Sequence, residues 1–119
     1  MPISWIEYKN KKIVYSDYRN QKGEEAIKTL YEERDFFLKL KDGDKVLVLS
    51  DFRGAYGSNE FMEISKKLGK EVFAPKTIKS AILGIEGVKK VLLKAYVFFT
   101  GENLKPFDSE ELAKEWLIE

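Results

Sequence analysis

Two short Asp-Xaa-Arg segments stand out in the sequence because their side chains could do chemistry. Asp17 and Arg19 follow one apolar run, and Asp51 and Arg53 follow another. If the two runs are neighbouring strands, these side chains gather at the carboxyl ends of the strands, where open α/β sheets usually bind ligands. The arginine forks could then hold an anionic or polar ligand. The same spacing also suits two corner salt bridges, in which each aspartate accepts backbone N–H groups at its own turn.

The composition excludes several classes of catalytic and metal site. The 119 residues include no cysteine and no histidine, so zinc–thiolate sites, histidine metal sites, thiol nucleophiles and Ser-His-Asp triads cannot be built. No spacing of the Asp, Glu, Lys or Tyr residues singles out a set for general acid–base catalysis. We therefore predict that the chain is not an enzyme and uses no metal and no cofactor.

The charge pattern and the length of the apolar runs bear on partners and location. Lys and Arg number 21 against 20 Asp and Glu, so the net charge is +1 and no strong field attracts nucleic acid. Lysines dominate residues 66–94, but this stretch has no arginine and no aromatic platform for bases. No apolar run is long enough to cross a bilayer, and no signal pattern begins the chain. We expect a cytoplasmic protein that binds neither nucleic acid nor membranes.

Apolar periodicity predicts strands that alternate with helices, in the order β-β-α-β-α-β-α-β-α. The expected elements are a hairpin that turns at Asn10, a helix over residues 23–40, a strand at 46–49, a helix at 61–72, a strand at 78–85, a helix at 88–99, a strand at 104–107 and a helix after Asp108. Such alternation implies parallel pairing, with the first hairpin strand antiparallel. The sequence therefore predicts a single α/β domain over residues 1–119, with a mixed, largely parallel sheet of about five strands and four helices.

The expected helix over residues 88–99 is apolar around most of its circumference. At 100° per residue, one arc of six apolar residues is predicted to face the core: Val88, Val91, Leu92, Ala95, Phe98 and Phe99. Leu93 and Val97 fall on the opposite, lysine-bearing face, four residues apart and so adjacent. This pair is either scattered exposure, which is common, or the centre of an interface. We take Leu93 and Val97 as the candidate interface of a two-fold dimer.

Three parts of the sequence resemble a known family. They are the run Lys12-Ile13-Val14-Tyr15-Ser16-Asp17-Tyr18-Arg19, the central strand that ends in Asp51 together with the run Ser80-Ala81-Ile82-Leu83-Gly84-Ile85, and the ending Phe107-Asp108 with Ala113-Lys114-Glu115-Trp116-Leu117. Together they resemble the SpoIIAA-like branch of the STAS superfamily, the small anti-sigma-factor-antagonist fold. The resemblance implies a STAS-like, non-enzymatic regulatory domain that acts by protein–protein contact. Its implied partner is a regulatory kinase or a second copy as a homodimer.

The resemblance also suggests one phosphorylation candidate. Phosphorylated members carry Asp-Ser-Ser/Thr-Gly at the helix start after the central strand. The corresponding place here reads Gly54-Ala55-Tyr56-Gly57-Ser58-Asn59, so only Ser58 could be equivalent. The preceding aspartate and the following glycine of the family pattern are missing.

Two alternative functions stay open. The superfamily borders on lipid-carrying domains, so the resemblance also allows a small apolar ligand in the cleft at the carboxyl ends of the strands. The segment Lys105-Pro106-Phe107 resembles the corner of response-regulator receiver domains, in which Asp51 would be the phosphoacceptor and Lys105 would contact its phosphoryl group. The receiver interpretation lacks an acidic pair after the first strand and has one helix too few before Asp51.

Overall fold

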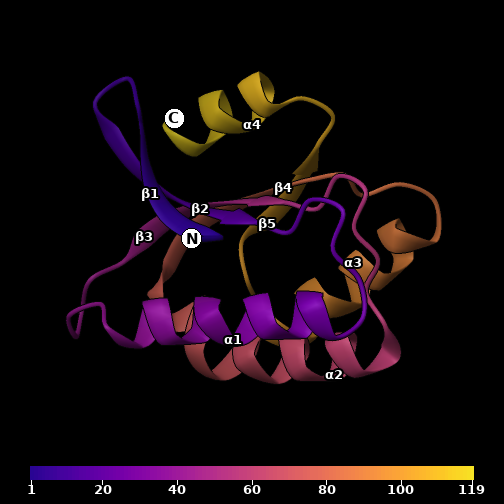
Figure 1. Cartoon of the computed structure of the whole chain (residues 1–119). Helices are drawn as coiled ribbons and strands as arrows, with labels where there is room; N and C mark the ends of the chain where they lie inside the picture. The colour runs from indigo at the N-terminus through magenta and orange to yellow at the C-terminus, as the bar shows by residue number, and fades with distance from the viewer.

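The computed structural model describes residues 1–119. They form three layers, with one sheet between two layers of helices (Figure 1). Helices α1 (Glu24–Leu38) and α2 (Asn59–Leu68) cover one face of the sheet, and α4 (Glu110–Leu117) covers the other. Helix α3 (Val88–Thr100) lies at the side, against α2 and the turn that follows it. No helix is both long enough and apolar enough to span a bilayer.

The sheet has five strands whose spatial order is the order of the sequence. They are β1 (Ile3–Tyr8), β2 (Lys11–Asp17), β3 (Val46–Asp51), β4 (Thr77–Leu83) and β5 (Leu104–Phe107). The β1–β2 pair is antiparallel and the other three pairs are parallel. Because each right-handed crossover steps in the same direction, α1, α2 and α3 are all kept to one side of the sheet. The predicted mixed, largely parallel α/β architecture and its element order are confirmed.

Local sequence explains the first turn and the end of the second helix. Lys9 and Asn10 both have positive φ, at 47° and 68°, as a tight two-residue hairpin turn requires. Helix α2 continues through a π-helical turn at Gly69–Phe73 and a 3₁₀ turn at Ala74–Lys76. A side chain at Gly69 would collide with Tyr96 and Thr100, so this glycine permits the close approach of α3.

Two separate hydrophobic cores lie on the two faces of the sheet. The larger one lies beneath α1 and α2 and includes Val14, Tyr18, Phe37 and Phe61. The smaller one lies beneath α4 and is formed by six buried residues: Ile13, Leu49, Ala81, Leu83, Ala113 and Leu117. This arrangement explains why β3 is apolar without alternation, since its successive side chains enter different cores.

The predicted orientation of α3 is wrong. No residue of this helix is buried, and the arc expected to face the core points to solvent, with Phe98 92% and Val88 73% exposed. Leu93 and Val97, which were expected on the outer face, are half-buried. The helix is apolar on most sides, so two polar-tipped side chains fix its orientation instead. Lys89 donates to the backbone oxygen of Ala55 at 2.6 Å, and Tyr96 packs against Gly69.

Candidate functional site

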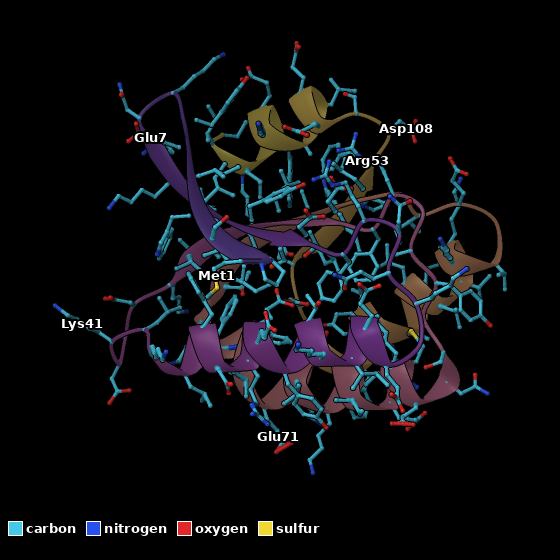
Figure 2. The ribbon with its side chains drawn as sticks, in the orientation of Figure 1. Met1, Glu7, Lys41, Arg53, Glu71 and Asp108 are labelled. Atoms are coloured by element: carbon cyan, nitrogen blue, oxygen red, sulfur yellow. The ribbon has the colours of Figure 1, made fainter.

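The two Asp-Xaa-Arg segments lie side by side at the carboxyl ends of β2 and β3. Asp17 is the register partner of Asp51 in the parallel pair, so the predicted gathering of these residues is confirmed. Arg53 lies on the α4 side of the sheet, beside the start of that helix (Figure 2). Its guanidinium is also 3.4 Å from Glu110 of α4.

The outer corner is an ion pair between Asp17 and Arg19. Asp17 accepts from the backbone N–H of Arg19 at 3.0 Å, and from Nε and Nη2 of the same arginine at 3.0 and 2.9 Å. The Arg19 side chain is 51% exposed. The hydrogen bond from this guanidinium lowers the pKa of Asp17, against a smaller opposing effect of burial.

The inner corner repeats this geometry around a carboxylate that has no exposed surface. Asp51 accepts from the backbone N–H, Nε and Nη2 of Arg53 at 3.2, 2.9 and 2.6 Å. Its Oδ2 also accepts from the Tyr15 hydroxyl at 2.8 Å, and Arg19 Nε is 3.9 Å away. Burial opposes ionisation of Asp51, but the hydrogen bonds from Arg53 and Tyr15 outweigh it and lower the pKa. Burial and the bond to Asp51 raise the pKa of Tyr15.

The four sequence-predicted residues therefore form the two corner salt bridges that the spacing allows. Each aspartate is paired with its own arginine, and about half of each arginine side chain remains exposed to solvent. Ligand binding by Asp17, Arg19, Asp51 and Arg53 stays a prediction, with the exposed guanidinium edges as the available donors. For the receiver-like alternative, Lys105 would have to approach Asp51, but its ammonium lies over the Trp116 ring, 5.2 Å from the centroid.

Ser58 is the N-cap of α2. Its Oγ accepts from the backbone N–H of Phe61 at 3.1 Å, and the serine backbone is extended, as a capping residue requires. The hydroxyl proposed for phosphorylation therefore already has a structural role at the start of the helix.

We expect Ser58→Ala to lower the free energy of unfolding by about 1 kcal/mol, because one N–H at the helix start loses its acceptor. Ser58→Asp keeps a capping oxygen and should retain most of the stability. Urea unfolding followed by circular dichroism measures both. An equal loss in the two variants would show that the cap is not the stabilising contact.

A buried polar cluster on the other side of the sheet was missed from the sequence. Glu33 of α1 is 7% exposed and accepts from Ser16 Oγ and the Tyr18 hydroxyl, both at 2.7 Å. Burial raises the pKa of Glu33, although these two hydrogen bonds partly offset it. A signal for Glu33 does exist in the sequence, since it shares the helical face of Ala26, Leu30 and Phe37, all of which are buried.

Glu102, in the turn between α3 and β5, extends this cluster toward α3. Burial raises its pKa from 4.5 to about 7; the Tyr96 hydroxyl opposes this rise, and the charge of Glu33 adds to it. Tyr96 is one of the two side chains that fix the orientation of α3, and burial raises its pKa strongly. The contact between α3 and the body of the protein thus includes a carboxyl group that titrates near neutral pH.

An open groove of about 540 Å³ separates α3 from β5. Seven residues line it: Lys90, Leu93, Lys94, Val97, Phe98, Leu104 and Pro106. Leu93 and Val97, predicted as an interface on the outer face, therefore form the floor of a groove. Sequence reasoning could not place this groove, because it depends on the orientation of α3.

Comparisons with known proteins bear on the fold. No family model matches the sequence, and no curated protein matches it. A solved structure does match: that of an uncharacterized protein from the DUF3478 family with a SpoIIAA-like fold, from Shewanella loihica PV-4. The TM-score is 0.73 at 17% sequence identity, and the match covers 97% of this chain and 91% of the other. The chain therefore has a SpoIIAA-like fold, as the sequence resemblance implied.

Proposed function

We propose that this chain is a non-enzymatic interaction domain that acts by contact with another protein, in the simplest case a second copy of itself. The observation that carries the proposal is the apolar face of α3. Five large residues of this one helix are exposed, by 38–92%: Val88, Val91, Leu92, Phe98 and Phe99. Every other helix buries at least one of its apolar residues in a core.

The size of this face supports an interface. The five side chains expose on the order of 500 Å², which is at the upper end of the largest apolar patches on monomeric proteins. A standard interface covers about 800 Å² on each partner, so the lysine stems beside the helix would complete it. A two-fold contact needs only one such self-complementary patch.

Charged residues border the apolar face of α3 along both edges. One edge carries Lys90 and Lys94, and the other edge, at Phe99, is bordered by Glu63 and Glu71 among three lysines. A two-fold axis parallel to α3 would set each edge of this face against the opposite edge of the partner. A regulatory kinase acting on Ser58 stays the second predicted partner, and a cytoplasmic location stays a prediction.

We expect the purified chain to sediment as a dimer at tens of micromolar. The double variant Val91→Glu/Ala95→Glu should be monomeric there, with at least a tenfold weaker self-association, because it places charge in the centre of the apolar face. Both residues are exposed and neither lines the groove, so folding should be unchanged by circular dichroism.

Leu112→Glu provides the matched control, since Leu112 is an exposed apolar residue of α4 on the other face of the sheet. It should sediment as the parent does. A parent chain that is monomeric throughout, or a double variant that still dimerises, would contradict self-association through α3.

A further inference from the structure

The groove between α3 and β5 combines an apolar floor with two cationic side chains. Leu93 and Val97 contribute the floor from α3, and Leu104 and Pro106 contribute the wall from the edge strand β5. Phe98 lines the rim of the groove and is itself 92% exposed. The volume of about 540 Å³ is within the range of about 300–1,000 Å³ typical of small-molecule sites.

The charge of the groove has one sign only. Lys90 and Lys94 stand one helical turn apart on the same side of α3, and both are exposed. No carboxylate lines the groove, and neither lysine has an ion-pair partner in the structure. Elsewhere, Lys9, Lys66 and Lys114 are paired with glutamates. Two unpaired ammonium groups beside an apolar trough are complementary to a molecule with an anionic head and an apolar tail.

We propose that this groove binds a small amphiphile with one anionic headgroup. The headgroup would lie between Lys90 and Lys94, and the chain would run along Leu93, Val97 and the side chains of β5. This site differs from the cleft at the carboxyl ends of the strands, and it does not depend on self-association through α3. Each methylene that leaves water contributes up to about fourfold to the affinity, so chain length and head charge make separate contributions.

Decanoate below its micelle concentration is a suitable probe, titrated by calorimetry and by amide NMR shifts of Lys90, Val97 and Leu104. Octanoate should bind several-fold more weakly, because two methylenes are lost. Decanol has the same chain with an uncharged headgroup, and decyltrimethylammonium has the same chain with a cationic headgroup. Both should bind at least tenfold more weakly than decanoate. Equal binding of all three decyl compounds would overturn the proposal.

The variant Lys90→Gln/Lys94→Gln removes the charge but keeps most of each side chain, and it should weaken decanoate binding at least tenfold. Lys28→Gln/Lys45→Gln removes the same charge elsewhere and should bind decanoate as the parent does. Unchanged affinity in the first variant would overturn the site. The variant Val91→Gln/Ala95→Gln disrupts the apolar face without placing a carboxylate beside Lys90 and Lys94. It should still bind decanoate even when it is monomeric, so that failure of this site and failure of the dimer are distinguished.

One further experiment tests whether the groove binds a free amphiphile or a lipid in a bilayer. Vesicles of phosphatidylcholine with and without phosphatidylglycerol are sedimented with the protein. Decanoate binding, with or without retention on the anionic vesicles, supports the proposal. Retention on anionic vesicles without any decanoate binding would overturn it in favour of a membrane-surface contact by α3.

Discussion

Replacing Asp51 with asparagine is expected to lower the free energy of unfolding by about 3 kcal/mol. The Asp51 side chain has no exposed surface and accepts from Tyr15 and from three donors of Arg53. Breaking a buried pair by removing one partner typically costs 3–5 kcal/mol. The loss here should lie toward the lower end, because the Arg53 side chain is 49% exposed and can be hydrated once its partner is gone.

Asp17→Asn is the matched control for Asp51→Asn. Asp17 is the register partner of Asp51 and makes the same backbone and guanidinium contacts, but its side chain is 30% exposed. Exposed ion pairs contribute about 0–1 kcal/mol, so this variant should lose less than about 1 kcal/mol. Urea unfolding of the two variants gives the comparison. Equal losses would show that burial of Asp51 does not determine how much its ion pair contributes to the free energy of unfolding.

The second large effect is a pH dependence of stability that originates at Glu102. Its pKa is about 7 in the folded protein against 4.5 for an ordinary glutamate. The folded state therefore binds more protons than the unfolded state between these values, and stability falls as pH rises through this window. The shift corresponds to at most about 3 kcal/mol, lost between about pH 4.5 and 7 and constant above it.

Chemical unfolding of Glu102→Gln across this pH range isolates the effect, because glutamine does not titrate. The difference in stability between the parent chain and Glu102→Gln should grow with pH and level off near pH 7. Tyr96→Phe removes the hydroxyl that lowers this pKa and should move the levelling-off to higher pH. Glu25→Gln, on an exposed side chain of α1, should follow the parent curve. A constant difference between the parent and Glu102→Gln at all pH values would show that Glu102 titrates normally.

Much of the fold could be predicted because it depends on local pattern. Asn10 in a short polar break predicted the hairpin, and the apolar run at residues 46–49 predicted a strand. Asp17 and Asp51 were predicted to meet because parallel strands end at the same edge of a sheet. Each of these inferences needs only residues that are close in sequence, together with general rules of strand pairing.

The parts that failed depend on which of several apolar faces packs inward. In α3 the apolar periodicity does not show which face packs against the protein. The polar ends of Lys89 and Tyr96 determine the orientation, through contacts with residues far away in the sequence. The hydrogen bond from Tyr15 to Asp51 could not be predicted from the sequence either. Tyr15 is opposite Leu49, so Asp51 is its diagonal neighbour, and that relation appears only once the register is known.

The match between strand order and chain order has a consequence for folding during synthesis. Each strand pairs with the one made just before it, so the sheet can grow by successive addition as the chain leaves the ribosome. The larger core involves no residue after Phe73, whereas the smaller core needs Ala113 and Leu117. Three residues on that face therefore stay uncovered until α4 has been made: Ile13, Leu49 and Leu83. Until α4 is made, we expect this face of the sheet to be exposed as apolar surface, and the packing of α4 completes the smaller core.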